Sequence, residues 1–347
     1  MNEVTIIVPI YNVEPYLRAC FDSLLNQTSR EFEILAVNDG SKDGCPAIMD
    51  EYAAKYPKLI KAVHKENGGY GSVLELAIQK CMTPYFLVCD PDDTLEPEAV
   101  ETLLSLAKMS DADLTVGAKN FVYEDSDAKD YDKSFNSTYA TLESNTIYRK
   151  GTAAFDNLFF LDPSPHAKLY KRKLSTSIRF PKKVGYTDNL LFYMNLLQAK
   201  SVIYTSQPLA NYLINRTGNS MQDVRFAAMN GEIDVFKTII DQAEEKQDVP
   251  DMFWYRMFES FKFMLYKTRR MNCDKVQYAE TLDHLETFLL KLMPHAEVIL
   301  PLYKKYTKNG VIERLRDEYL LKPQLENLTF ARLKKKMTKG FTASEIN

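Results

Sequence analysis

Apolar and polar positions alternate along the first third of the chain in a repeating strand and helix pattern. Short continuous apolar runs rich in β-branched residues predict buried strands, and amphipathic stretches between them predict helices. The predicted strands cover residues 4–9, 32–37, 59–64, 85–89 and 113–117, and the predicted helices cover 16–27, 47–56, 68–81 and 97–107. This order predicts right-handed βαβ units, and therefore an α/β fold with a mostly parallel, Rossmann-like sheet covered by helices on both faces.

The alternation stops after residue 119. The polar stretch 123–139, rich in Tyr, Asp and Ser, is predicted to run over the surface without regular structure. Further elements at 152–159 (helix), 168–170 (strand), 188–198 (helix), 202–204 (strand) and 209–213 (strand) close the domain. Beyond residue 222 apolar residues recur at a spacing of three and four, which predicts helices alone. We therefore expect an α/β domain over residues 1–222 and a helical domain over 223–347, with an aromatic stripe at 253–263 as helix-packing core.

Composition narrows the class of protein. The chain has 347 residues, 45% of them hydrophobic and 26% charged, which is typical of a globular protein. A formal charge of −3 argues against a general nucleic-acid binder. No stretch offers the roughly 20 apolar residues that cross a bilayer, and no secretory signal is visible, so we expect a cytoplasmic protein. Five cysteines without Cys-x-x-Cys spacing indicate reduced thiols. The basic segment 332–339 is either a solvated tail or a peripheral contact with the inner membrane face.

Three carboxylates follow the apolar strand at 85–89 directly, in the sequence Asp90-Pro91-Asp92-Asp93. Open parallel sheets bind ligands beyond the carboxyl ends of their strands, so these acids lie where a site is expected. Clustered carboxylates repel one another, and a hard divalent cation such as Mn²⁺ or Mg²⁺ relieves that repulsion. The alternative is a polar turn, because Asp-Pro-Asp-Asp is also favourable turn chemistry.

Two earlier strand ends and a glycine cluster provide the other candidate groups. The first strand ends in Pro9-Ile10-Tyr11-Asn12 and the second ends at Asp39, and in a doubly wound sheet these ends are neighbours. An acid there can accept hydrogen bonds from a ribose or base, although 38–41 also fits a simple turn. The cluster Gly68-Gly69-Tyr70-Gly71 opens a helix whose backbone N–H groups favour phosphate. It matches neither a dinucleotide fingerprint nor a P-loop.

Taken together, these motifs resemble the N-terminal signature of family 2 glycosyltransferases. The matching segments are 4–12, 24–28, 33–44, 67–69 and 90–93, and the resemblance continues through 168–172, 178–181, 186–192 and 208–212. It covers roughly residues 3–222 and leaves the helical half unexplained. The resemblance implies a GT-A fold, a UDP-sugar donor, a divalent metal and transfer with inversion at the anomeric carbon.

The family's site residues carry over position by position. The resemblance implies that Asp90 and Asp92 form the Asp-x-Asp motif for ribose and metal, with Asp92 as the first metal ligand, and that Asp188 is the general base. It also implies nucleotide-sugar contacts at the positions Pro9, Tyr11, Asn12, Asp39, Gly69, Asp93 and Arg216. The competing interpretation of Asp188 is a first-turn acid behind an N-cap at Thr187.

The chain departs from the family pattern at two of these positions. Thr187 stands where Glu is commoner, and Leu74 stands where the family often has an Arg. The cations that could replace this Arg are Lys168, Lys171, Arg172 and Arg216. His166 lies near the acceptor side of the alignment, but a lone His is more often structural, so we assign it no catalytic role.

The leading hypothesis is therefore a metal-dependent, inverting transferase that moves a hexose or N-acetylhexosamine from a UDP-sugar to a glycan, glycoprotein or lipid-linked acceptor. One alternative is a non-catalytic nucleotide-sugar-binding subunit that supports a partner transferase. Another is a nucleotidyltransferase with the same nucleotide-binding geometry, which would show pyrophosphate chemistry. The helical half is the candidate surface for a homodimer.

Overall fold

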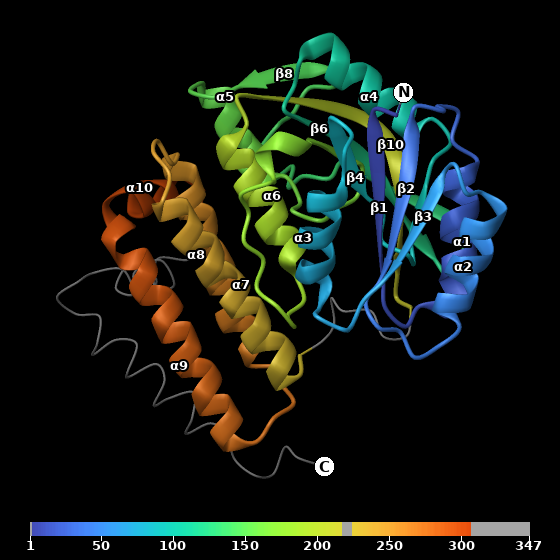
Figure 1. The fold of residues 1–347 in the computed structure, drawn as a ribbon. Helices are drawn as coiled ribbons and strands as arrows, with labels where there is room; N and C mark the ends of the chain where they lie inside the picture. The colour runs from blue at the N-terminus through green and yellow to red at the C-terminus, as the bar shows by residue number, and fades with distance from the viewer. Residues whose placement is uncertain (1, 217–223, 307–347) are drawn as a thin grey trace. The chain divides into compact units, whose positions relative to one another are not determined.

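The computed structural model describes residues 2–216 and 224–306, which belong to two compact units (Figure 1). The first unit holds the described residues up to 216, and the second holds those from 224 onward. The boundary predicted near residue 222 lies outside the described residues, as does the basic segment 332–339. None of the described helices is both long enough and apolar enough to cross a bilayer.

A sheet of ten strands forms the centre of the first unit, in the order β3-β2-β1-β4-β9-β6-β10-β5, with β7 beside β6 and β8 beside β10. The strands are β1 (Val4–Ile10), β2 (Phe32–Asn38), β3 (Ile60–His64), β4 (Tyr85–Val88), β5 (Thr94–Leu95), β6 (Leu114–Tyr123), β7 (Ser126–Asp132), β8 (Thr146–Arg149), β9 (Lys168–Lys171) and β10 (Ser201–Ile214). Along the main path only β9 and β5 run against the other strands. The predicted α/β fold with a mostly parallel sheet is confirmed.

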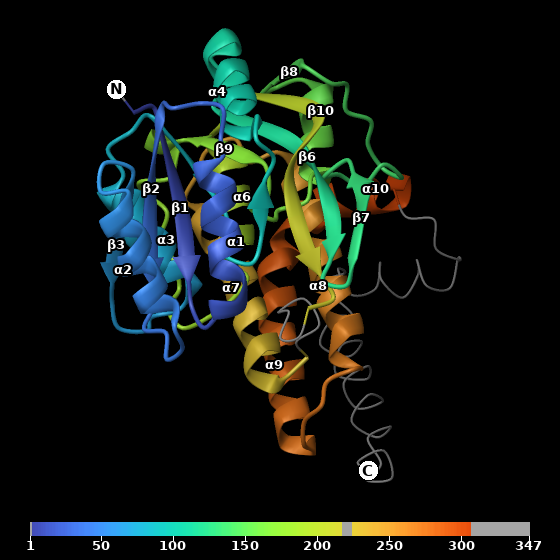
Figure 2. The same ribbon diagram turned by 90° about the vertical axis from the view of Figure 1, so that its right-hand side faces the viewer.

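Helices cover both faces of this sheet (Figure 1). One face packs against α1 (Glu14–Leu25), α2 (Cys45–Lys55) and α4 (Ala99–Ser110), whose apolar residues join those of β1 and β2 in one buried cluster. The other face carries α3 (Tyr70–Lys80) and α6 (Thr187–Gln198), as the turned view in Figure 2 also shows. Each fully buried Leu or Phe side chain in such a core stabilises the fold by about 1.5–3 kcal/mol. This core fixes the strand ends that carry the polar groups.

Two expectations about the sheet were wrong. The segments 202–204 and 209–213 are not separate strands but parts of β10, which continues through a bulge near Pro208. A bulge adds an unpaired residue and changes the side-chain alternation, so the sequence looks like a break. The stretch 123–139 is mostly exposed as predicted, although Ser134 and Phe135 are buried. It is not irregular throughout, because β7 pairs with β6 in an antiparallel hairpin. β7 is polar on both sides, which hides it from the apolar pattern.

The second unit is helical, as predicted. It contains α7 (Phe226–Glu244), α8 (Asp251–Thr268), α9 (Lys275–Leu292) and α10 (Ala296–Tyr306), and its core includes the buried rings of Phe253, Trp254, Phe258 and Phe261. Phe263, which we placed in this aromatic core, is 60% exposed because it points away from the neighbouring helices. The prediction of a helix-packing role is therefore right for the stripe and wrong for Phe263.

Candidate active site

The loops after β1 and β2 meet at the carboxyl edge of the sheet. Parallel pairing sets Ile10 beside Asn38, so the residues that follow them lie side by side. The side-chain oxygen of Asn12 accepts from the backbone N–H of Lys42 at 2.8 Å. The backbone N–H of Asn12 donates to Ser41 Oγ at 3.1 Å. Pro9 is buried within β1, whereas Tyr11 is 49% exposed at the rim. The structure thus leaves the Tyr11 ring accessible beside the second loop, as a base-stacking role requires.

Asp39, which follows β2, binds the glycine-rich loop at residues 68–71. Its buried carboxylate accepts from the backbone N–H groups of Gly68 at 2.9 Å and Gly69 at 2.8 Å, and it forms an ion pair with Lys65. The expectation that these two N–H groups are free for phosphate is therefore wrong, because Asp39 already accepts both. Sequence reasoning also missed Lys65, which donates to Ser72 Oγ at 2.9 Å as well. Nucleotide contacts by Asp39 and Gly69 stay predictions.

The backbone at position 69 requires a glycine. Its φ of +85° suits glycine, and a Cβ added there would lie 2.8 Å from the backbone N of Lys183. Lys183 in turn donates its N–H to Gly68 O at 2.6 Å. The glycine loop and the segment before α6 are therefore packed backbone to backbone.

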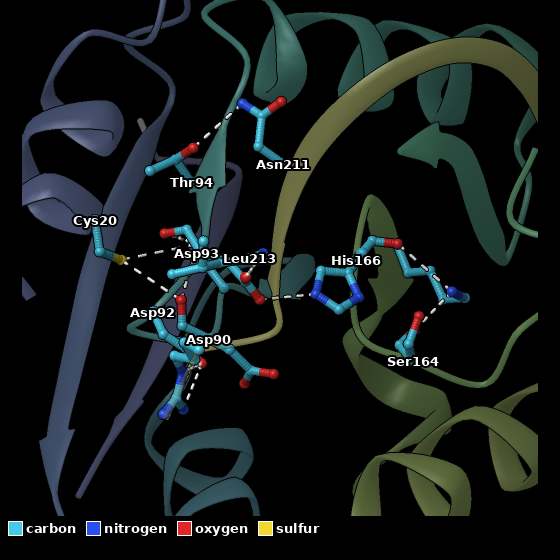
Figure 3. A network of polar contacts seen from close by, with 12 residues as sticks. Cys20, Asp90, Asp92, Asp93, Thr94, Ser164, His166, Asn211 and Leu213 are labelled. Carbon is cyan, nitrogen blue, oxygen red and sulfur yellow. Dashed lines mark hydrogen bonds and ion pairs between the residues drawn. The ribbon is translucent and has the colours of Figure 1, made fainter. Parts of the chain in front are cut away.

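Each of the three carboxylates after β4 contacts different partners. Asp90 accepts from the Tyr70 hydroxyl at 2.7 Å, and Asp92 forms an ion pair with Arg216 through two nitrogens, Nε and Nη2, each at 2.6 Å. Asp93 accepts from the backbone N–H of Leu213 at 2.8 Å and pairs with His166 Nε2 at 2.7 Å (Figure 3). The loop closes through a bond from Asp93 N to Asp90 O at 3.0 Å. It is a turn, as the alternative interpretation held, and it also concentrates negative charge.

Burial and mutual charge repulsion perturb two carboxylates of this loop. Burial and the neighbouring charges of Asp93 and Asp92 raise the pKa of Asp90 well above its usual range. Burial and Asp92 likewise raise the pKa of Asp93, against the opposing effect of the Leu213 N–H. The ligand atoms of Asp90, Asp93 and His166 all lie within 4.8 Å of one another. Because carboxylate oxygens are the ligands that Mg²⁺ and Mn²⁺ prefer, these groups fit a divalent ion. Asp92, the first metal ligand that the resemblance implies, is not in this group and pairs with Arg216 instead, so its role as a ligand stays a prediction.

His166 is a member of this site that sequence reasoning set aside. Its side chain is buried, and burial together with the charges of Lys119 and Lys168 holds its pKa well below the usual value. A neutral ring that donates from Nε2 to Asp93 leaves Nδ1 unprotonated, and Nδ1 has no hydrogen-bond partner within the described part of the chain. Its ring lies 4.2 Å from that of Tyr212. The one sequence signal was its place near the acceptor side in the family alignment.

Asp188 joins the same neighbourhood from α6. It is the second residue of that helix, and its charge contributes to the raised pKa values of both Asp90 and Tyr70. Thr187 does not cap α6, because the N-cap is Tyr186 and the buried Thr187 hydroxyl has no partner among the described residues. Thr187 instead packs on Gly71, where an added Cβ would lie 3.1 Å from its methyl group. The N-cap role of Thr187 is therefore wrong, whereas Asp188 does lie in the first turn of α6, as the competing interpretation held.

The structure separates the four cations that could replace the missing Arg at Leu74, a residue now buried in the core. Arg216 alone among the four pairs with a carboxylate of the Asp-x-Asp loop. Lys168 is buried, donates to Ser164 O at 2.6 Å, and has a pKa lowered to about 7 by burial and by Lys119. Lys171 pairs with Asp111, and Arg172 donates to Ile78 O, both at the opposite end of the short strand β9.

Comparisons with known proteins show which family this chain is similar to. The family model described as glycosyl transferase family 2 matches residues 5–179. Glycosyltransferase GlyA of Streptococcus pneumoniae is 31% identical over 226 residues, which cover 62% of this chain and 31% of that protein. The poly(ribitol-phosphate) beta-glucosyltransferase of Bacillus spizizenii is 25% identical over 340 residues, covering 92% of this chain and 51% of that protein. The chain therefore spans between about a third and a half of these relatives.

A solved structure extends the likeness to the whole fold. The crystal structure of residues 1–349 of TarS from S. aureus, in complex with UDP-GlcNAc, superposes with a TM-score of 0.72 at 17% identity, covering 98% of this chain and 92% of that one. At this identity the likeness shows the fold alone. It confirms the predicted GT-A fold followed by a helical region.

Proposed function

Because the chain belongs to glycosyl transferase family 2, we propose that it transfers a hexose or N-acetylhexosamine from a UDP-sugar to an acceptor hydroxyl, with inversion at the anomeric carbon. The observation that carries this proposal is the cluster of Asp90, Asp92 and Asp93 at the end of β4, with Asp188 close enough to raise the pKa of Asp90. This cluster lies at the carboxyl edge of a parallel sheet, where such sheets bind nucleotides, and its position therefore supports a nucleotide ligand.

In this proposal, different residues around the loop contact different parts of the UDP-sugar. Tyr11 offers an exposed ring for the uracil, and Asp39 with Gly69 shapes the adjoining loop. We propose that Asp92 and Asp90 hold Mn²⁺ or Mg²⁺, with Asp93 and His166 beside them, and that the ion when bound supplies positive charge to the departing diphosphate. Arg216 adds a guanidinium at the same place, suited to bidentate contact with phosphate oxygens. This is how we account for the absent family Arg.

The acceptor side of the reaction rests on Asp188. Inversion requires the acceptor oxygen to attack from the face opposite the diphosphate, and its proton must then pass to a base within hydrogen-bond reach. We propose that this proton moves from the acceptor hydroxyl to a carboxylate oxygen of Asp188. The packing of Lys183 on Gly69 and of Thr187 on Gly71 holds the backbone that leads into the base.

The relatives guide the choice of substrates to test. The Bacillus spizizenii protein, matched over 92% of this chain, is named for glucosyl transfer to poly(ribitol-phosphate), which supports a polymeric acceptor. TarS, on the same fold, was crystallised with UDP-GlcNAc. We propose a hydroxyl on a glycan, glycoprotein or lipid-linked chain as acceptor. Cytoplasmic location, contact with the inner membrane face through 332–339 and a homodimer through the helical unit remain expectations.

The experiment that tests the proposal is a donor screen. Purified protein is incubated with UDP-glucose, UDP-galactose, UDP-GlcNAc or UDP-GalNAc and with Mn²⁺ or Mg²⁺, and released UDP is measured. We expect release from one donor, lost on addition of EDTA or in Asp92→Ala. Release that survives both changes would refute the metal assignment. UDP binding without turnover of any donor, unchanged in Asp188→Ala, would instead favour a non-catalytic nucleotide-sugar-binding subunit.

A further inference from the structure

A hollow lies in the first unit, apart from the carboxylate loop. It has a volume of about 270 Å³ and forms where the segment between β7 and β8 crosses β10. On β10 its wall includes Tyr204 and Ser206, whereas Leu213 of the same strand contacts Asp93. At about 3.3 Å per strand residue, the two places are separated by roughly 25 Å. The bulge of β10 near Pro208 lies between them.

The walls of this hollow are held in place by hydrogen bonds. Tyr131 donates its hydroxyl to Ser206 O at 3.0 Å, and Tyr204 donates its hydroxyl to Lys133 O at 3.0 Å. The backbone N–H of Ser206 donates to Ser144 Oγ at 2.9 Å. These bonds join three separate segments of the chain, so the hollow is formed before any ligand arrives, which lowers the cost of binding.

The floor and the rim of the hollow differ in chemistry. The floor is apolar and buried, formed by Phe135, Ala140, Leu142 and Tyr204. The rim carries three exposed residues with hydroxyl groups, Thr141, Ser144 and Ser206, and Tyr131, which is 49% exposed, also lines the hollow. A pyranose ring presents an apolar C–H face and a polar edge of hydroxyls. An aromatic face and a few placed polar groups are what such a ligand requires.

Size and charge limit the ligand further. The volume is slightly below the usual range for drug-sized ligands, which begins at about 300 Å³, and suits a single sugar unit. The neighbouring strand β7 holds three Asp and one Lys, so a net charge of −2 lies beside the rim. Lys133 is the cation that lines the hollow, and its ammonium lies 6.0 Å from the ring centre of Phe135. A strongly anionic ligand is therefore disfavoured here.

We propose that this hollow is an accessory carbohydrate site that binds one neutral pyranose unit of the acceptor chain, away from the site of transfer. The inference rests on the proposed glycosyltransferase function for the identity of the chain it holds. Its consequence is that an acceptor of several sugar units contacts the protein at two separated places. Such a second contact raises the effective concentration of the acceptor hydroxyl near Asp188.

The test uses the full chain, saturating UDP and Mn²⁺, and saturation-transfer NMR with methyl β-D-glucopyranoside and with methyl N-acetyl-β-D-glucosaminide. We expect binding of one of these at about millimolar affinity, unchanged by UDP. Tyr131→Ala removes the exposed ring and should weaken binding about tenfold. Thr141→Val removes a rim hydroxyl with little change in volume and should also weaken it. Tyr266→Ala, at a residue 59% exposed on α8, is the matched control and should bind normally.

Several outcomes would overturn the inference. They are absence of saturation transfer from either glycoside, competition by UDP-sugar, binding unaffected by both hollow variants, or stronger binding of glucose 6-phosphate than of the glucoside. Release of UDP by Tyr131→Ala at the wild-type rate shows that the variant is folded. Sugar binding at the hollow in a chain that transfers no sugar would refute the proposed function and leave the site itself standing.

Discussion

The guanidinium of Arg216 holds the carboxylate of Asp92 through two nitrogens, Nε and Nη2, each 2.6 Å from the same oxygen, Oδ2. The same guanidinium lies 5.2 Å from the ring centre of Tyr16, whose hydroxyl donates to Glu124 Oε1 at 2.8 Å. Both side chains of the ion pair are about 15% exposed, so solvent screens the pair only in part. A cation that binds Asp92 must therefore share this carboxylate with Arg216.

Replacing Arg216 should weaken donor turnover. We expect Arg216→Ala to lower kcat/KM for the UDP-sugar by about tenfold to a hundredfold, since it removes a charge-assisted donor beside the diphosphate. Arg216→Lys should recover only part of this, because an ammonium cannot form the two-nitrogen contact. Steady-state UDP release measures the effect. Arg18→Ala, which breaks an exposed ion pair with Glu51, is the control. Equal rates in Arg216→Ala and the control would remove Arg216 from the site.

Replacing Asp188 should separate chemistry from binding. We expect Asp188→Asn to slow transfer by about 10²–10⁴-fold, because the amide cannot take the proton of the acceptor hydroxyl. UDP affinity, measured by calorimetry, should stay within about twofold of wild type, since Asp188 contacts the acceptor side in our proposal. A large loss of UDP affinity with unchanged transfer at saturating donor would contradict the assignment of Asp188 as base.

The raised pKa values of Asp90 and Asp93 predict a pH-dependent stabilisation by metal. An acid whose pKa is higher in the folded chain binds more protons when folded, so its effect on the free energy of unfolding becomes less favourable as pH rises from about 4 through the folded pKa. Metal needs the ionised form. We therefore expect Mn²⁺ to raise Tm more at about pH 7.5 than at about pH 5.

Two comparisons make the pH experiment specific. Asp93→Asn removes one of the mutually repelling charges and should reduce the difference between the two pH values. His166, whose pKa is lowered by burial, contributes stability above about pH 6.5 that is lost as pH falls, so only the change in Tm on adding Mn²⁺ is compared. An equal rise in Tm at both pH values would argue against a metal on these carboxylates.

Gly69 should tolerate no side chain. Gly69→Ala combines a φ of +85° with a Cβ placed 2.8 Å from the Lys183 backbone, and we expect it to lower the free energy of unfolding by roughly 2–4 kcal/mol. Gly151→Ala, at a φ of +86° with nothing within 4 Å of the added Cβ, should cost only about 1 kcal/mol. Denaturant titration of both variants separates steric clash from backbone strain. Equal losses of unfolding free energy in the two variants would show that the backbone at Lys183 moves to accommodate the added Cβ.

The sequence predicted the strand and helix order of residues 4–117, apart from the two-residue strand β5, because β1, β2 and β4 are mostly apolar, buried runs. It marked the carboxylates after β4 and Asp188 as one candidate site because they lie at element ends, and the structure places Asp188 close enough to raise the pKa of Asp90. The role of Asp188 as base stays a prediction. The sequence could not predict that Asp39 binds the glycine loop, because this depends on how two separate loops pack together. Gly68 and Gly69 lie 29 and 30 positions after Asp39 in the chain. Nor could it place His166, because a lone His carries no periodic signal.

The long chain separations within the site bear on the order of folding. The bond from Leu213 to Asp93 joins residues 120 positions apart, and that from Arg216 to Asp92 joins residues 124 apart. Contacts of such separation form late, because a large loop must close before they are made. We expect the β1, β2 and β4 core to collapse first and the carboxylate loop to be fixed last. Pulse-labelled hydrogen exchange should then find the Leu213 amide protected after those of β1.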